Sequence, residues 1–302
     1  MSGLRYIVEP GFFASGPVHV ALAVGTVIAV TSAVVGLFTV TRGQSFAGHS
    51  LADIATTGGS GAFLIGVNQF WGYLAFGAGA AAFMEMIGIQ RRRGRDVATG
   101  VVLGAALGLA ALFLYLGTQY SSTTGASFTI LFGSMFVITS STVPALIGSA
   151  LLALATVVAL ARVLLLTSLS PDVAAARGVP VRAVGAAFLM ALAVSVALSA
   201  VIIGAVLSTA LLIGPAATAL RVTKGPARAA VVAAGIGVAA TWLGILLAYD
   251  SFYWHPAGRG WPVSFFVVTL IVGGYLVSYL RPDRRRVAAR ENQDPEHACS
   301  AA

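Results

Sequence analysis

His49 and Asp53 are the residues of this chain whose types and spacing most clearly allow chemistry. They lie four residues apart in the stretch FAGHSLADIATTGGSG at residues 46–61, inside an otherwise apolar run. In a helix, residues at this spacing share one face, so an imidazole and a carboxylate would project together. Ionisable side chains are costly at membrane depth and usually face a bundle interior or a water-filled path. The pair therefore predicts a transient cation site, which Ser50 or Thr57 could complete.

A structural interpretation of the same pair stays open. His49 and Asp53 could bond only to each other and hold two helices together. Under that interpretation, a substitution would lower the amount of folded protein in proportion to its activity. A cation site would instead lose activity at normal protein abundance.

The composition is that of a protein that crosses a membrane many times. Of 302 residues, 58% are hydrophobic and only 9% are charged, and the mean hydropathy is +0.92. Soluble domains carry about 25% charged residues. Apolar runs of about 20 residues, long enough to span a bilayer as a helix, recur along the chain. We therefore expect one transmembrane domain over residues 18–280, between an external segment at 1–17 and a disordered, basic cytoplasmic tail at 281–302.

Basic residues outnumber acidic ones by 18 to 10, for a net charge of +8. In a soluble protein this excess would favour nucleic-acid binding, but here nearly all Lys and Arg residues fall at alternate joints between apolar runs. The positive-inside rule places those joints in the cytoplasm, so the charge reports topology and we expect no nucleic-acid partner. The only cysteine, Cys299, lies in the polar tail, which excludes a disulfide framework and a thiolate metal site.

The apolar runs predict an all-α integral membrane fold with about eight to nine transmembrane helices. Residues 126–141 are short and rich in Ser and Thr, and a full crossing there would carry later Arg residues to the outer side. We therefore expect a re-entrant or half-membrane element in this segment. A second interruption is expected at Gly214 and Pro215, because proline removes a backbone donor and disfavours helical geometry in the residue before it. A simple proline kink explains that second position equally well.

The connecting segment SLSPDVAAARGVPVR at residues 168–182 has the start and stop signals of one short helix. A serine that can cap, a proline suited to the first helical position and an acidic residue in the first turn stand at its start. A glycine that can adopt a left-handed conformation closes it. Small alanines would allow a partner protein to approach closely, so the joint is either a docking element or only a compact turn. The residues that would form the docking element are Ser170, Pro171, Asp172, Ala175 and Gly178.

Sequence patterns of common hydrolases are missing from this chain. It has no G-x-x-x-x-G-K-[ST] phosphate loop, no H-E-x-x-H zinc-protease pair and no G-x-S-x-G nucleophile elbow. We therefore expect a protein that moves or holds a substance rather than an enzyme, with no covalently bound cofactor.

Five stretches in order resemble the permease subunits of bacterial ABC-type zinc, manganese and iron importers. The family pattern G-D-A-L-S-H-A-x-x-P-G aligns with GHSLADIATTG at residues 48–58. The family patterns D-x-A-x-G, L-F-G, D-P-E-x-A-x-x-x-G and L-L-x-x-P-A-A-T-A align with RDVATG at 95–100, LFG at 131–133, SPDVAAARG at 170–178 and LLIGPAATA at 211–219. The likeness runs from about residue 18 to residue 279. It implies a type II ABC importer fold with several passes through the bacterial cell membrane.

The resemblance also implies roles for single residues. In the family, the residues aligned with His49 and Asp53 lie on the cation route, and the D-P-E joint docks in a groove of a cytoplasmic ATPase. This chain has His49 before Asp53 where the family has Asp before His, and Thr57 replaces the usual proline. Ser170 replaces the aspartate of the docking joint, which exchanges one good helix cap for another.

These observations predict a homodimeric permease subunit of an ABC importer for a divalent metal cation, zinc or manganese with iron as a further option. Because the chain has no phosphate loop, a separate ATPase subunit would use the ATP, and an extracellular substrate-binding protein would deliver the cation. Carboxylate and imidazole without thiolate suit these metals, and the sequence does not choose among them. The alternative is a stand-alone secondary cation transporter or channel, with Asp53 and Glu85 as cation or proton sites and no need of a docking helix.

Overall fold

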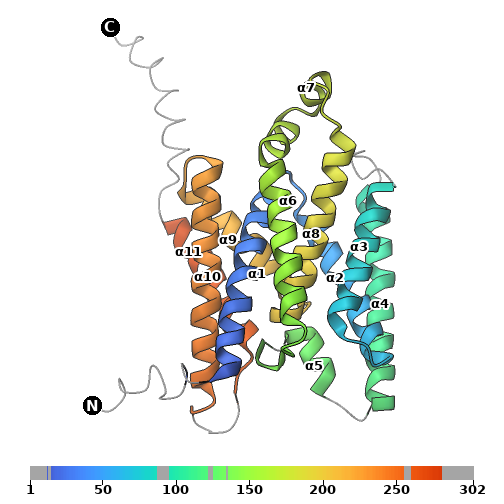
Figure 1. The fold of residues 1–302 in the computed structure, drawn as a ribbon, viewed down its shortest axis with the longest axis vertical. Helices are drawn as coiled ribbons and strands as arrows, with labels where there is room; N and C mark the ends of the chain where they lie inside the picture. The colour runs from blue at the N-terminus through green and yellow to red at the C-terminus, as the bar shows by residue number, and fades with distance from the viewer. Residues whose placement is uncertain are drawn as a thin grey trace, which may run out of the picture.

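Most of the residues that the structure describes are in helices, and the rest form turns and loops. The computed structural model describes residue 12 and residues 15–86, 95–121, 125–133, 135–254 and 260–280, and these residues contain no β-strand. Most of the predicted external segment at 1–17, the basic joint at 87–94 and the tail at 281–302 lie outside the described residues. Figure 1 shows the helices, which are α1 (Gly16–Thr41), α2 (Ser45–Leu64), α3 (Gln69–Met86), α4 (Arg95–Ser121), α5 (Gly125–Phe132), the short 3-10 helix η2 (Met135–Val137), α6 (Val143–Leu169), α7 (Pro171–Ala176), α8 (Val181–Ile203), α9 (Ser208–Val222), α10 (Pro226–Ser251) and α11 (Val263–Leu280).

Six helices within the described residues are long and apolar enough to cross a membrane, namely α1, residues 100–120 of α4, α6, α8, α10 and α11. Two further helices, α2 and α3, have 20 and 18 residues. At 1.5 Å per residue, 18 residues extend about 27 Å, close to the roughly 30 Å of bilayer hydrocarbon. The all-helical membrane fold is therefore shown, and the number of eight to nine crossings stays a prediction.

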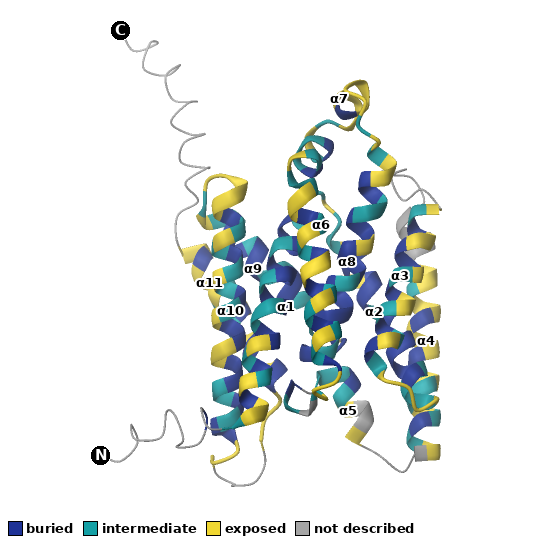
Figure 2. Cartoon of the chain, in the orientation of Figure 1, coloured by how far each residue is buried: buried dark blue, intermediate teal, exposed yellow. Residues whose placement is uncertain are grey.

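The centre of the bundle is formed by α1 and α8, most of whose residues are buried (Figure 2). Small polar residues join the two helices: the hydroxyl of Ser32 in α1 lies 2.8 Å from the hydroxyl of Ser199 in α8. Small residues let helix backbones approach closely inside a membrane, and hydroxyls hydrogen-bond there across helices. Around this centre, α2 packs beside α3, α4 and α8, while α9 packs beside α1, α10 and α11.

Glycines set the closest helix contacts. A Cβ atom at Gly58 of α2 would collide with the backbone oxygen of Gly72 in α3, and a Cβ at Gly72 would collide with that of Gly58. Gly36 of α1 stands in the same relation to the backbone oxygen of Leu212 in α9. These contacts hold α2 closely against α3 and α9 closely against α1.

The short helix α5 and the link between α8 and α9 meet near the end of the bundle opposite α7 (Figure 1). The helix α5 has eight residues, about 12 Å of helix, which is too short to cross the membrane. This agrees with the half-membrane element expected at residues 126–141. Between α8 and α9 the chain leaves helical geometry at Gly204, which has a φ of 89°. The backbone N–H of Ala205 in this link donates to the carbonyl of Ile130 in α5 at 3.1 Å, so α5 braces the link.

The expected break at Gly214 and Pro215 is wrong. The helix α9 runs continuously from Ser208 to Val222 with Pro215 buried inside it, and the interruption lies ten residues earlier, at Gly204. Proline is tolerated inside membrane helices where neighbouring helices and local adjustments compensate the lost backbone bond. Glycine, in contrast, supplies the positive φ that a sharp turn needs without steric cost.

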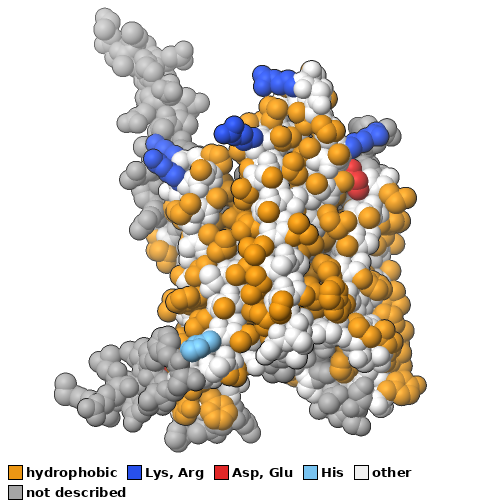
Figure 3. All heavy atoms as spheres, in the orientation of Figure 1, with side chains coloured by type: hydrophobic (Ala, Val, Ile, Leu, Met, Phe, Trp, Pro, Cys, Tyr) orange, Lys and Arg blue, Asp and Glu red, His pale blue; other side chains and the backbone are white. Residues whose placement is uncertain are grey.

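The face of the bundle drawn in Figure 3 is apolar along its length and basic at one end. Only 17% of the apolar window of α4 is buried, and only 33% of that of α11. Such apolar helix surface suits contact with lipid. The Lys and Arg side chains visible in Figure 3 gather at the end of the bundle that carries α7, which is the end predicted to be cytoplasmic.

Candidate functional site

His49 and Asp53 lie together on one face of α2, one helical turn apart. The Nε2 atom of His49 is 3.5 Å from Oδ2 of Asp53. The His49 side chain is 48% exposed and that of Asp53 is 13% exposed, so the carboxylate is sheltered and the imidazole is open on one side. This is the arrangement that the four-residue spacing predicted.

A third residue, Thr209, joins this pair from another helix. Its Oγ1 lies 3.1 Å from Nδ1 of His49, across a sequence separation of 160 residues. Thr209 is the second residue of α9, directly after the link at Gly204. Sequence reasoning missed it, because the only local signal was one hydroxyl among several in an apolar run. The imidazole of His49 thus lies between Asp53 at Nε2 and Thr209 at Nδ1.

The hydroxyls of Ser50 and Thr57, the two other predicted ligands, form hydrogen bonds to backbone carbonyls and not to the His49–Asp53 pair. Both are buried. The hydroxyl of Ser50 donates to the carbonyl of Phe46 within α2 at 2.9 Å. The hydroxyl of Thr57 donates at 2.7 Å to the carbonyl of Ala106 in α4. The structure therefore uses Thr57 to join α2 to α4 and Ser50 to bond its own helix, and neither is brought against the pair.

The separation of the two ligand atoms suits a shared cation. In a tetrahedral zinc site, metal–ligand distances of about 2.0–2.2 Å place two ligand atoms roughly 3.4 Å apart, and Nε2 of His49 and Oδ2 of Asp53 are 3.5 Å apart. Among the residues that the structure describes, no group of three or more His, Cys, Asp and Glu side chains gathers at one place. One chain therefore supplies an imidazole and a carboxylate, fewer strong ligands than a closed structural metal site contains.

The predicted docking joint forms the short helix α7, which projects from the basic end of the bundle (Figure 1). Pro171 occupies the first turn with Asp172, Ser170 precedes the helix without a side-chain capping bond, and Gly178 follows it with a φ of 77°. The observed start and end of α7 therefore match the start and stop signals in the sequence. Ala175 is exposed, so its small surface is open to a partner.

Arg42 connects the start of α2 to the helices that flank α7. It directly follows α1, and its Nη1 donates to Oγ1 of Thr167, near the end of α6, at 2.9 Å. Its guanidinium carbon lies 5.2 Å from the ring centre of Phe188 in α8. Burial lowers the pKa of Arg42 from its ordinary value, because the charged form loses hydration, yet a guanidinium remains charged in proteins. Sequence reasoning assigned Arg42 to topology alone.

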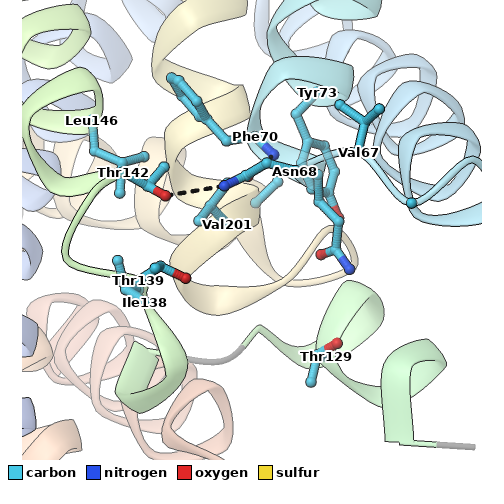
Figure 4. A pocket seen from close by; sticks show the side chains of 13 residues that line it. Val67, Asn68, Phe70, Tyr73, Thr129, Ile138, Thr139, Thr142, Leu146 and Val201 are labelled. Carbon is cyan, nitrogen blue, oxygen red and sulfur yellow. Dashed lines mark hydrogen bonds between the residues drawn. The ribbon is translucent and has the colours of Figure 1, made fainter. Parts of the chain in front are cut away.

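A cavity of about 350 Å³ opens toward the end of the bundle opposite α7, between the start of α3, the start of α6, α5 and the end of α8 (Figure 4). The side-chain amide of Asn68 donates to Oγ1 of Thr142 across it at 3.0 Å. The buried hydroxyl of Tyr73 donates to the carbonyl of Ile130 at 3.3 Å. Neither His49 nor Asp53 lines this cavity, so it is separate from the candidate cation site.

Comparison with known proteins identifies the family. A model described as the ABC 3 transport family matches residues 17–277, which is most of the chain. The chain belongs to the ABC 3 transport family. This confirms the resemblance drawn from the five sequence stretches, and the family is one of transport proteins rather than a class of enzymes.

Similar proteins agree with this assignment. The chain is 28% identical over 240 residues to the "Manganese transport system membrane protein MntC" of Listeria innocua, a match that covers 79% of this chain and 84% of that one. It is 30% identical over 231 residues to the "Manganese import system permease protein ScaB" of Streptococcus parasanguinis, covering 76% and 81%. The solved structure "PsaBC from Streptococcus pneumoniae in complex with Fab" has the same fold, with a TM-score of 0.77, 24% identity and coverage of 93% and 97%.

Proposed function

We propose that this chain is the permease subunit of an ABC importer that carries a divalent metal cation, with manganese as the first candidate and zinc as the second. The observation that carries the proposal is the His49–Asp53 pair at ligand-to-ligand distance on α2, in a chain of the ABC 3 transport family. Manganese is placed first because two similar proteins are named for manganese transport. An imidazole and a carboxylate suit both metals.

Transport would be driven by a separate ATPase subunit docked on α7. The helix projects beyond the bundle at the basic end, and the face that carries Ala175 is open. Arg42, in the link between α1 and α2, is bonded to Thr167 near the end of α6, so a displacement of the docking helix could pass through this link to the helix that carries His49. An extracellular substrate-binding protein would deliver the cation at the opposite end.

The working unit would be a homodimer in which the cation passes His49 and Asp53 of each chain. Two strong ligands per chain hold a cation weakly enough for release, and a transport site must release its ion. The 48% exposure of the His49 side chain leaves one side of the imidazole free for the ion.

Cation uptake into reconstituted vesicles tests the proposal. The permease and its ATPase are placed in liposomes, and uptake of radiolabelled manganese or zinc is measured with and without ATP. Asp53→Asn keeps the size of the side chain and removes its charge, and His49→Ala removes the imidazole. We expect each variant to abolish uptake while membrane abundance and dimer assembly stay near normal.

Three outcomes would contradict the proposal. Parental uptake by both variants would remove the cation site. Uptake that proceeds equally without ATP would favour the stand-alone transporter or channel. If activity instead fell only in proportion to protein abundance, the pair would serve to hold helices together, as the structural interpretation states.

A further inference from the structure

Thr209 contacts Nδ1, the ring nitrogen of His49 that the proposed cation site does not use. With Nε2 directed at Asp53 at 3.5 Å, the ring presents Nδ1 to Oγ1 of Thr209 at 3.1 Å. A histidine that binds a metal through one nitrogen usually donates the N–H of the other nitrogen to a nearby acceptor, which fixes the tautomer and the ring orientation. We propose that Thr209 is a positioning residue that holds Nε2 of His49 toward the cation, an inference that rests on the proposed function of the His49–Asp53 pair.

A hydroxyl suits this position in both states of the site. Without a cation, an Nε2–H can face the Asp53 carboxylate, and Nδ1 then accepts a hydrogen bond from the Thr209 hydroxyl. When Nε2 binds the cation, the single proton of the neutral imidazole resides on Nδ1, and the Thr209 oxygen accepts from it. A hydroxyl rotates to donate or to accept, whereas a backbone carbonyl could serve only the second state. The imidazole carries one proton before and after, exchanged through the open side of the ring.

Thr209 is itself held in place by the link that precedes it. The link begins at Gly204, and its Ala205 N–H is bonded to the carbonyl of Ile130 in α5. On the next turn of α9, Leu212 packs its backbone against Gly36 of α1. The site therefore combines α2 with a short helix that begins inside the bundle, and the separation between α2 and α9 decides whether His49 is oriented for the cation.

Equilibrium binding of Zn²⁺ and Mn²⁺ to the full-length permease in lipid nanodiscs tests the inference. Thr209→Val keeps the shape of the side chain and removes the hydroxyl, and we expect its dissociation constant to rise by about 10- to 100-fold, the usual effect of losing an outer partner of a metal-binding histidine. Thr209→Ser restores a hydroxyl and should recover most of that loss, with a dissociation constant less than about 10-fold above the parent's. Thr269→Val is the matched control, because Thr269 lies in α11 and, among the described residues, its hydroxyl bonds the carbonyl of Phe265 in the same helix.

A second measurement reports the tautomer directly in the parent permease and needs no variant of Thr209. The permease is labelled with ¹⁵N-histidine, and the imidazole signals lost in His49→Ala are assigned to His49. Zn²⁺ should move the protonated nitrogen from Nε2 to Nδ1. A Zn²⁺-bound His49 that is protonated at Nε2 would overturn the inference.

The binding results separate this inference from the proposed function. If His49→Ala and Asp53→Asn weaken binding while Thr209→Val binds as the parent does, the role of Thr209 is wrong and the cation site stands. Binding by Thr209→Ser that is as weak as that of Thr209→Val would also overturn it, because shape rather than the hydroxyl would then matter. If neither His49→Ala nor Asp53→Asn changes binding, the cation site fails and the inference fails with it.

Discussion

Replacing Gly36 by alanine should loosen both the bundle and the cation site. The new Cβ would overlap the backbone oxygen of Leu212, whereas ordinary contact begins at 3.4 Å, so α1 and α9 must separate by more than about 1 Å. Because backbone atoms cannot rotate away as a side chain does, this overpacking should cost about 2–3 kcal/mol, the upper part of the usual range. The gain in helix propensity from glycine to alanine returns about 1 kcal/mol. We expect a net loss of about 1–2 kcal/mol in the free energy of unfolding.

The same displacement should reach the cation site. Leu212 lies three residues from Thr209, on the same side of α9, so moving one moves the other. The 3.1 Å contact between Thr209 and His49 would then exceed the roughly 3.2 Å upper limit of a normal N–H···O hydrogen bond. Zn²⁺ affinity should therefore fall together with stability in Gly36→Ala.

Unfolding in mixed detergent micelles and Zn²⁺ binding measure the two effects. Gly235→Ala in α10 is the matched control, because nothing lies within 4 Å of the Cβ position there, and it should be as stable as the parent or up to about 1 kcal/mol more stable. A Gly36→Ala permease within about 0.5 kcal/mol of the parent, the usual scatter of such comparisons, would refute the close packing of α1 against α9.

Three further predictions concern coupling and topology. Ala175→Glu should prevent co-purification with the ATPase and ATP-driven uptake at normal membrane abundance, because it adds bulk to the exposed face of α7; parental uptake would argue against docking there. Unfolding in micelles of Arg42→Ala, Thr167→Val and the double variant should give a coupling energy of about 1.5–3 kcal/mol, as expected for a hydrogen bond to a charged group. Additive effects of the two substitutions would show that this contact does not stabilise the fold. In the Arg177→Cys, Cys299→Ser double variant, an impermeant thiol reagent added outside the cell should not label position 177. Labelling of that position would reverse the predicted orientation.

Features that depend on nearby residues could be predicted from the sequence. The long apolar runs predicted a helical membrane protein, because each helix satisfies its own backbone inside a bilayer. The period of the α-helix put His49 and Asp53 on one face, where the structure has them 3.5 Å apart. Proline, aspartate and glycine around α7 predicted its limits, because capping and positive φ are properties of single residues and their neighbours. Spacing along the chain was sufficient in each case.

Features that depend on contacts between helices were decided only by the tertiary structure. Thr209 reaches His49 across 160 residues, and no local pattern distinguishes it from the other hydroxyls of the chain. Thr57 has the right spacing for the site, yet packing against α4 directs its hydroxyl to Ala106. Pro215 had the local chemistry of a helix break, but α9 continues through it, while α5 braces an interruption at Gly204. Small and apolar side chains allow many ways of packing one helix against another, so which groups meet is set by the free energy of the whole bundle.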